Sequence, residues 1–188
     1  TSSSPCAGGA CTGAGIGPGR IDRVIGVIKA YCTRVGEGPF PTEDSGALGD
    51  ALRAKGGEYG ATTGRPRRCG WEDLVAADYA VKINGIDGLA LTKLDVLTGF
   101  KEIKVCTSYE VDSELRTHFP TSCGELAKAR PIYETLPGWT EDISKCRRFE
   151  DLPLAARSYV NFIEERTGVP VLLIGVGVGR EDTILRGI

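Results

Sequence analysis

The chain has 188 residues, of which 41% are hydrophobic and 26% are charged, and its formal net charge is −2. A chain of this length and composition can bury a core, and so small a net charge gives no global field to attract nucleic acid or an anionic membrane. No apolar stretch reaches the ~18 residues that a membrane-spanning helix needs, so we expect partners other than nucleic acid or a membrane.

The first part of the chain is expected to contain three helices separated by turns rich in glycine and proline. Residues 1–18 are rich in Gly, Ser and Thr and predict a loop. Helices are predicted over about 46–55 and about 71–83. A further helix is predicted over about 20–32, because apolar residues recur there on one helical face, namely Ile21, Val24, Ile25, Ile28 and Cys32.

The second part of the chain mixes apolar strands with one well-delimited helix. Strands are predicted over 89–97, 103–111 and 169–175. Residues 111–119 are expected to complete a hairpin, and 131–139 to form a loop or a short strand. A helix is predicted over 152–166, because Gly168 follows its end and Pro170 prevents continuation. The glycine-rich residues 175–182 are expected to open a last short helix.

Helices that alternate with apolar strands are typical of an α/β fold, here with a mainly parallel sheet and flanking helices. We expect residues 1–188 to form a single domain segment. The chain contains no methionine and begins abruptly on Thr1-Ser2-Ser3-Ser4, which indicates part of a longer protein.

Cysteine and histidine usage bounds the chemistry. None of the seven cysteines forms a C-x-x-C pair and their spacing is irregular, which predicts reduced thiols of a cytoplasmic protein rather than a disulfide framework. The only histidine is His118, so we predict neither a histidine-based metal cluster nor any metal ligand in this chain.

Three arginines lie within four positions in the segment GATTGRPRRCGW, residues 60–71. A guanidinium group binds a carboxylate or phosphate through two parallel hydrogen bonds, and Pro66 stiffens the backbone from which Arg65 and Arg67 leave. Thr62, Thr63 and Gly64 add hydroxyl and N–H groups, so the loop suits a small dianion. The alternatives are a solvated basic turn, or arginines in salt bridges to surrounding acids.

The segment Leu91-Thr92-Lys93-Leu94-Asp95 ends a predicted strand. A carboxylate there can accept hydrogen bonds from the ring N–H and the amino group of guanine, a donor pair that adenine does not present. The aliphatic stem of Lys93 could cover the base. Ligands bind at the carboxyl ends of strands in open α/β sheets, although K-x-D also occurs often by chance.

Two glycine-rich segments allow both functional and structural interpretations. Gly175-Val176-Gly177-Val178-Gly179-Arg180 lacks the spacing of a dinucleotide fingerprint, and the acid expected roughly 20 positions later cannot exist before Ile188. Its backbone could pack on a flat ring, or form a tight strand-to-helix turn. The N-terminal TSSSPCAGG could line a phosphate or sugar, or be a flexible loop.

Taken in order along the chain, several motifs together carry a family resemblance. They are TSSSPCAGGACTGAGIGP, KAYCTRVGEGPFPTE, GEYGATTGRPRRCGW, INGIDGLALTKLDVL, YETLPGW, and FIEERTGVPV followed by REDTI. In this order they resemble the C-terminal part, a little under half, of adenylosuccinate synthetase. The resemblance implies a P-loop-NTPase-like α/β fold that is incomplete without its N-terminal half.

The resemblance also implies a function and site residues. The family is a Mg²⁺-dependent, GTP-coupled ligase of purine nucleotide (AMP) biosynthesis that joins IMP to L-aspartate: GTP phosphorylates the 6-oxygen of IMP, and the aspartate amine then displaces that phosphate. The IMP phosphate would contact Thr1, and the IMP ribose Arg65. Guanine nucleotide would contact Arg67, Lys93, Leu94, Asp95, Gly175, Val176 and Gly177. L-Aspartate would contact Ala61, Thr62, Thr63, Gly64, Arg65, Pro66 and Arg67.

The chain departs from the family pattern in two respects. It reads GVGVGR where the family commonly has Ser-Thr-Gly-Pro, which leaves backbone but not hydroxyl contacts to guanine. It also contains no GDEGKGK-like phosphate loop, catalytic aspartate or catalytic histidine, and His118 does not match that histidine's motif. We therefore expect no catalytic residue here, Mg²⁺ held mainly by the N-terminal half, a homodimer only in the full-length enzyme, and no ligase activity from this chain alone. The alternatives are a non-catalytic guanine-nucleotide-binding module and a generic anion-binding α/β domain.

Overall fold

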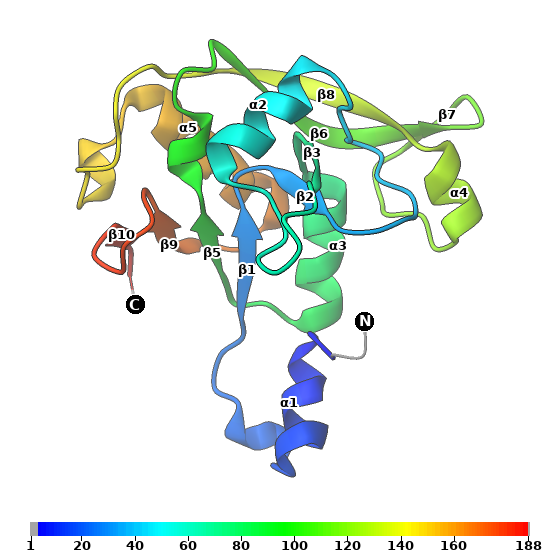
Figure 1. Ribbon diagram of the computed structural model, residues 1–188. Coiled ribbons are helices and arrows are strands. Elements are labelled where there is room, and N and C mark those ends of the chain that lie inside the picture. The colour runs from blue at the N-terminus through cyan, green and yellow to red at the C-terminus, as the bar shows by residue number, and fades with distance from the viewer. Residues whose placement is uncertain (1–3, 188) are drawn as a thin grey trace.

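A four-stranded, mostly parallel sheet forms the centre of the computed structural model, which describes residues 4–187 (Figure 1). Three parallel strands lie side by side in the order β1 (Ile25–Lys29), β5 (Gly88–Thr92) and β9 (Val171–Gly175). The short strand β10 (Thr183–Leu185) pairs antiparallel with β9 at one edge. The predicted α/β class with a mainly parallel sheet is confirmed.

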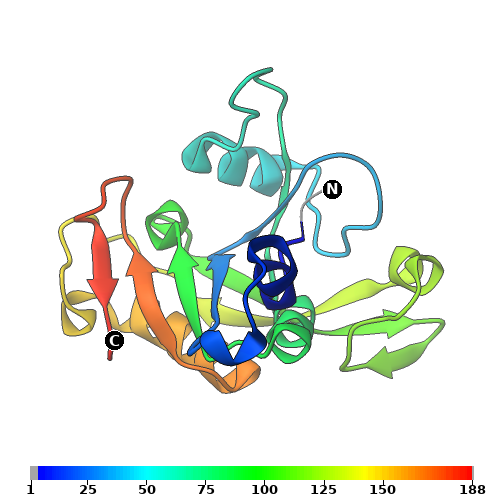
Figure 2. The same ribbon diagram turned by 90° about the horizontal axis from the view of Figure 1, so that it is seen from below.

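Two helices cover one face of this sheet. Helices α3 (Leu74–Asn84) and α5 (Leu154–Thr167) lie together on the same side of the strands (Figures 1 and 2). Helix α3 begins where the Asp73 carboxylate accepts hydrogen bonds from two backbone N–H groups, and α5 ends at Gly168 in the left-handed conformation. The predicted helices over 71–83 and 152–166 are confirmed within a few residues.

A second sheet packs against the other side of α3. Its long strand β6 (Glu102–Val111) pairs in parallel with β4 (Glu72–Asp73) and antiparallel with β7 (Glu114–Arg116) and β8 (Arg130–Pro137). The predicted strand over 103–111 and its hairpin are confirmed. Residues 131–139, expected as a loop or short strand, supply most of β8. The short helix α4 (Cys123–Lys128) lies between β7 and β8 along the chain.

A smaller layer lies above the carboxyl ends of the central strands. It consists of α2 (Ala47–Gly56), which confirms the helix predicted over 46–55, and the antiparallel pair β2 (Cys32–Arg34) and β3 (Arg68–Gly70) (Figure 1). The 3-10 turn η2 (Leu94–Leu97) follows β5 and contacts both α2 and β9. Residues 61–67, which we call the arginine loop, lie between α2 and β3 along the chain. The loop is therefore held over the end of the sheet.

Four predictions of secondary structure are wrong in whole or in part. The strand predicted over 89–97 ends at Thr92, because Lys93 adopts a left-handed backbone and Leu94–Leu97 form η2. Residues 20–32 contain strand β1 (Ile25–Lys29) rather than a helix, since pairing with β5 and β-branched side chains outweigh a helical spacing of apolar residues. Helix α1 (Ala7–Ala14) occupies part of the expected N-terminal loop and lies apart from the sheet (Figure 1). Residues 175–182 turn back into β10 instead of opening a helix.

Strand β1 forms the other edge of the central sheet, and its apolar side chains are only partly covered. Val27 is 73% exposed, whereas Leu89 and Leu91 in the next strand are fully buried. A hollow of about 830 Å³ runs from this edge to α1. Among residues 4–187, no helix combines the length and apolarity needed to cross a bilayer.

Some of the abundant glycines pack against the backbone of this same chain. A Cβ atom at Gly70 would lie 1.8 Å from the Thr42 carbonyl oxygen, and one at Gly138 would lie 1.9 Å from that of Phe100. Gly70→Ala is therefore expected to lower the free energy of unfolding by about 1–3 kcal/mol or more, because backbone must move. Urea unfolding checks this.

Gly124→Ala is the matched control for that substitution. Gly124 lies in α4 with no heavy atom within 4 Å of the added methyl group, so alanine is expected to be neutral or slightly stabilising there. Equal urea midpoints for the two variants would show that the close approach at Gly70 contributes nothing to stability.

Candidate functional site

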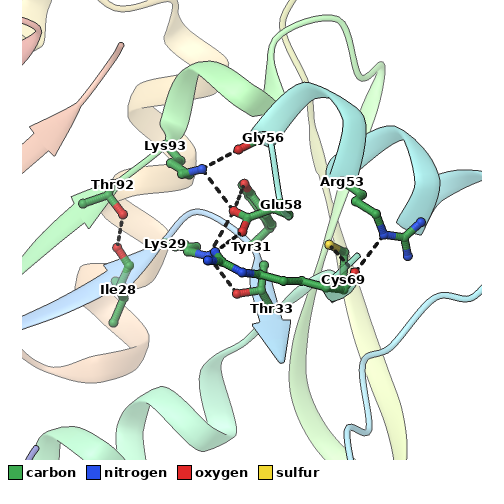
Figure 3. A network of polar contacts seen from close by, with 11 residues as sticks. Ile28, Lys29, Tyr31, Thr33, Arg53, Gly56, Glu58, Cys69, Thr92 and Lys93 are labelled. Atoms are coloured by element: carbon green, nitrogen blue, oxygen red, sulfur yellow. Dashed lines mark hydrogen bonds and ion pairs between the residues drawn. The ribbon is translucent and has the colours of Figure 1, made fainter. Parts of the chain in front are cut away.

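The candidate site lies where the carboxyl ends of β1 and β5 meet the segment that follows α2. Ligands of open α/β sheets bind at this end of the strands. The two strand ends are tied together, because the Thr92 hydroxyl donates to the Ile28 carbonyl oxygen at 2.9 Å and the Ala30 N–H donates to the Thr92 carbonyl oxygen (Figure 3). Lys93 and Asp95 therefore project from a braced end of the sheet.

A single buried carboxylate, that of Glu58, organises the polar groups of this site (Figure 3). Its Oε1 accepts hydrogen bonds from Tyr31 Oη at 2.6 Å and Lys29 Nζ at 3.0 Å, and pairs with Lys93 Nζ at 3.1 Å. Its Oε2 accepts from Arg67 Nη1 at 2.7 Å. We call these five residues the Glu58 cluster. It joins the arginine loop to the Lys93-x-Asp95 segment.

The charges of the Glu58 cluster keep its carboxylate ionised. Burial would raise the pKa of Glu58, but hydrogen bonds from Tyr31, Lys29, Lys93 and Arg67 outweigh that effect and lower the pKa to about 2. Because the folded pKa is below the unfolded value, the cluster contributes stability above pH 4.5 that is lost as pH falls toward 2. Three cations surround one anion, so the cluster keeps an excess of positive charge.

The arginine loop is a compact turn with an exposed tip. The Gly64 N–H donates to the Gly60 carbonyl oxygen, the Gly60 N–H donates to that of Arg65, and the Arg67 N–H donates to that of Glu58. Gly64 has φ +65°, a left-handed conformation that favours glycine. The side chains of residues 61–66 are exposed, so the hydroxyl groups and the first guanidinium of the loop face solvent.

The three arginines differ in their partners. Arg68 pairs through two nitrogens with Glu43 and donates to the carbonyl oxygens of Gly36 and Gly38, so the salt-bridge interpretation holds for this residue. Arg67 is held by Glu58 but keeps a buried Nε without a partner among the described residues. The Arg65 guanidinium makes no hydrogen bond or ion pair within residues 4–187. Arg65 and Arg67 are thus the two with donors left for a ligand.

Lys93 directs its ammonium group into the protein. Lys93 Nζ donates to the Gly56 carbonyl oxygen at the end of α2 and pairs with Glu58 (Figure 3). Its backbone has φ +61°, which non-glycine residues rarely adopt. The hydrogen bond of Lys93 to the end of α2 and its ion pair with a buried carboxylate stabilise this residue in such a conformation.

Asp95 has the property expected of a ligand-binding carboxylate. Its Oδ1 is buried and has no hydrogen-bond partner among the described residues, whereas buried carboxylate oxygens are normally paired. Burial raises the pKa of Asp95, which Lys93 and a backbone hydrogen bond partly offset. The neighbouring Leu94 is fully buried in the core, so only its backbone is available to a ligand.

The glycine-rich segment lies beside the Lys93-x-Asp95 segment. A Cβ atom at Gly175 would lie 3.4 Å from Thr92 Cα, so β9 brings the start of this segment against the end of β5. Asp182 closes the turn, since its carboxylate accepts the Gly179 N–H at 2.8 Å and its carbonyl oxygen accepts the Val176 N–H at 2.8 Å. Val176 is fully buried, which leaves its backbone as the available surface.

Other sequence-predicted residues lie outside this site. Thr1 falls among the residues that the structure does not describe. His118 is exposed in the turn after β7, and all seven cysteines are unbonded thiols. Within residues 4–187, no group of three or more His, Cys, Asp and Glu side chains is arranged to hold a metal ion.

A buried acid pair below the site predicts a pH-dependent stability. Burial and the neighbouring Asp73 raise the pKa of Glu72 to about 8, although Cys32 Sγ donates to its Oε2 at 3.4 Å. The folded state then holds a proton that the unfolded chain releases above about 4.5, so this group's contribution to stability falls as pH rises from about 4.5 to about 8.

Glu72→Gln is expected to flatten this decline and to stabilise the chain at pH 8 by a few kcal/mol, since one pKa unit is worth on the order of 1 kcal/mol. Urea unfolding of the wild type and Glu72→Gln across this pH range measures the difference. The exposed Glu102 on β6 provides the control Glu102→Gln, which should follow the wild type. Parallel pH curves for wild type and Glu72→Gln would contradict the assignment.

A carboxylate, arginines and glycine-rich turns gathered at the carboxyl ends of parallel strands are typical of ligand-binding α/β proteins. A family model described as adenylosuccinate synthetase matches residues 1–184. The chain is 58% identical over 184 residues to adenylosuccinate synthetase of Streptomyces coelicolor, and 59% identical over 185 residues to that of Pelotomaculum thermopropionicum. The structure of fully ligated adenylosuccinate synthetase from Plasmodium falciparum matches with a TM-score of 0.95 at 43% sequence identity. The chain therefore belongs to the adenylosuccinate synthetase family.

The match is nearly complete for this chain and partial for its relatives. Both bacterial comparisons cover 98% of this chain and 43% of the relative, and the structural comparison covers 100% of this chain and 45% of the Plasmodium chain. The chain thus spans a little under half the length of these relatives.

Sequence reasoning missed the residue at the centre of the site. Glu58 directly precedes the arginine loop in GEYGATTGRPRR, but an acid next to a glycine pair carries no sign that it is buried. The signal that could have identified it is charge balance, because several cations predicted to share one end of a sheet need a counter-ion. Lys29 and Tyr31 were missed because the helix predicted over 20–32 does not place them at the end of a strand.

Proposed function

We propose that this chain supplies the aspartate loop and the guanine site of an adenylosuccinate synthetase, a GTP-dependent ligase that joins IMP to L-aspartate in AMP biosynthesis. The observation that carries the proposal is the buried Oδ1 of Asp95, which has no partner among the described residues, in a segment whose start at Thr92 and Lys93 lies against Gly175. A carboxylate oriented toward the N–H and amino groups of guanine would satisfy this atom, whereas adenine offers no matching pair of donors. The similarity of the whole chain to the family supports the same assignment.

In this proposal the arginine loop binds the amino-acid substrate. Arg65 and Arg67 pair with the two carboxylates of L-aspartate, and Thr62 and Thr63 supply hydroxyl contacts. Ala61, Gly64 and Pro66 shape the turn that carries them. The available donors of Arg65 and of Arg67 Nε support these roles. Arg65 also reaches the IMP ribose, Arg67 lies near the nucleotide phosphates, and Thr1 contacts the IMP phosphate.

The guanine site in this proposal uses the two adjacent strand ends. Asp95 accepts from the base, the backbones of Leu94, Gly175, Val176 and Gly177 border it, and Lys93 holds the segment in place. The close approach of Gly175 to the end of β5 supports a shared surface. The stem of Lys93 is close enough in sequence to cover the base, although its ammonium group is directed at Glu58.

The reaction needs opposite charges placed beside one another. The γ-phosphoryl group of GTP passes to the 6-oxygen of IMP. The amine of L-aspartate then attacks the carbon that bears this oxygen and displaces phosphate. A dicarboxylate must approach an anionic intermediate, and the excess positive charge of Arg65, Arg67 and the Glu58 cluster offsets the repulsion. These residues bind and orient; none of them is proposed to transfer a proton.

Mg²⁺ in this family would act at the phosphates. The described residues do not offer a set of metal ligands, so we propose that the metal is held mainly by the part of the enzyme that this chain does not match. We further propose a cytoplasmic location, a homodimer for the full-length enzyme, and no ligase turnover by the 188-residue chain alone. The alternative of a non-catalytic guanine-nucleotide-binding module is not favoured, because identity to the synthetases extends over 98% of the chain.

Calorimetric titration of the chain with GTP, ATP and IMP tests the proposed function. GTP is expected to bind at least roughly tenfold more tightly than ATP, because Asp95 would make charged hydrogen bonds to guanine only. Equal binding of the two nucleotides would contradict the guanine assignment. Absence of any nucleotide binding, with the chain folded, would favour an anion-binding domain in which these segments are structural.

A further inference from the structure

Glu58 is fixed in place by its backbone as well as by its side chain. Glu58 lies just beyond the end of α2, and its N–H donates to the carbonyl oxygen of Arg53 in that helix at 2.9 Å. Its carbonyl oxygen accepts the Arg67 N–H at 2.9 Å, across the base of the arginine loop. The Glu58 side chain is 0% exposed, so solvent does not compete for the carboxylate itself. This residue is rigidly tied to both α2 and the loop.

The two oxygens of Glu58 face different parts of the site. Oε2 pairs with Arg67 of the arginine loop, whereas Oε1 pairs with Lys93 of the Lys93-x-Asp95 segment and with Lys29 at the end of β1. A displacement of Arg67 by a ligand therefore changes the charge felt by Lys93 across a single buried carboxylate.

Lys93 would transmit such a change along the backbone to Asp95. Its backbone is in the left-handed region at φ +61°, and its ammonium group is held by Glu58 and the Gly56 carbonyl oxygen (Figure 3). Asp95, two residues further on, carries the unpartnered Oδ1. If the hold on Lys93 loosens, the backbone that orients Asp95 can relax toward an ordinary conformation.

Arg67 offers a route by which a dianion acts on this arrangement. Its Nη1 is occupied by Glu58, while its buried Nε has no partner among the described residues. Its carbonyl oxygen is also held, by Arg53 Nε at 2.8 Å. A carboxylate bound at Arg67 would either compete with Glu58 for the guanidinium group or accept a hydrogen bond from its Nε. Either change would alter how Glu58 pairs with Lys93.

We propose that Glu58 is a positioning residue that couples ligand occupancy of the arginine loop to guanine binding at Asp95, by holding Arg67 and Lys93 on the two oxygens of one carboxylate. This inference rests on the proposed function, since it names the device by which the two halves of that site communicate. Coupling between two sites is reciprocal: L-aspartate changes the affinity for guanine nucleotide by the same factor as guanine nucleotide changes the affinity for L-aspartate.

The test measures that factor in wild type and Glu58→Gln. The dissociation constant of GDP is determined by calorimetry with and without saturating L-aspartate. We expect the two values to differ at least about fivefold in the wild type and to agree within error in Glu58→Gln. A residue that acts only on stability would lower the fraction folded and leave the ratio unchanged. The matched control Glu43→Gln removes a carboxylate that pairs with the neighbouring Arg68 and not with Lys93, and it should keep the wild-type ratio.

A measurement without substitution covers the case in which Glu58→Gln does not fold. L-Aspartate added to the isotopically labelled wild-type chain should shift the amide resonances of Gly56, Lys93 and Asp95 as well as those of the loop. The inference is overturned if both ligands bind but independently, if Glu58→Gln keeps the coupling, or if L-aspartate shifts only the loop. A wild-type chain that binds neither ligand would instead overturn the proposed function itself, so the two failures are distinguishable.

Discussion

Asp95→Asn is expected to weaken guanine-nucleotide binding by roughly 30-fold or more without destabilising the chain. Truncating one partner of a buried, charged hydrogen-bonded pair costs about 2–5 kcal/mol of binding. The same change removes a buried charge whose Oδ1 has no partner within the described protein, and whose burial raises the pKa of Asp95. The variant should therefore unfold at the same or a higher urea concentration, while calorimetry shows weaker binding of GTP. Any weak binding of ATP should be unaffected.

Asp78→Asn is the control for this substitution. Asp78 lies on α3, where it pairs with the exposed Lys82, so its removal should change neither nucleotide affinity nor stability appreciably. Two results would count against the role given to Asp95: unchanged GTP affinity in Asp95→Asn, or a stability loss as large as that of a core substitution. The second result would mean that the Asp95 carboxylate supports the fold rather than a ligand.

Arg65→Ala and Arg68→Ala are expected to have opposite effects, although the two residues are only three positions apart. Arg65→Ala should weaken L-aspartate binding by roughly 30-fold or more, since it removes a charged partner of a carboxylate. It should leave the urea midpoint unchanged, because the Arg65 side chain makes no polar contact within residues 4–187. Arg68→Ala should instead lower stability by about 1 kcal/mol, because it breaks a solvent-exposed double contact with Glu43 and two exposed hydrogen bonds to the Gly36 and Gly38 carbonyl oxygens.

The pair of variants separates a binding arginine from a structural one. Titration with L-aspartate and urea unfolding are performed on both proteins and on the wild type. A destabilised Arg65→Ala with normal L-aspartate binding would show that the exposed guanidinium supports the loop and not a ligand. Loss of binding in Arg68→Ala at unchanged stability would reassign the dianion site to the Glu43 side of the loop.

Much of the fold could be predicted from local pattern. Helices α3 and α5 and strands β6 and β9 follow from apolar periodicity together with Asp73 at a helix start and Gly168 at a helix end. Strand β1 could not be predicted in this way. Its isoleucine and valine residues also suit a helical face, and only pairing with β5, more than 60 residues later, decides between the two.

The segments that form the candidate site were predicted from the sequence, but the contacts between them were not. The arginine loop and the Lys93-x-Asp95 segment each have a recognisable pattern of donors and acceptors. The prediction that Lys93 covers a base did not anticipate that its ammonium group would meet Glu58. Which arginine is structural also depends on Glu43, which lies on a segment 25 positions earlier. Such contacts arise from tertiary packing, and a local pattern does not contain them.

We propose that the arginine loop and the two adjacent strand ends form one ligand site organised by Glu58. The most direct measurement is a map of amide chemical shifts in the isotopically labelled chain titrated with GDP and with L-aspartate. GDP is expected to perturb residues 93–95 and 175–177 together, and L-aspartate is expected to perturb residues 61–67 with an extension to Lys93. Perturbations confined to the hollow that Val111, Arg116 and His118 line at the β6–β7 hairpin, or scattered over the surface without either group of residues, would contradict this proposal.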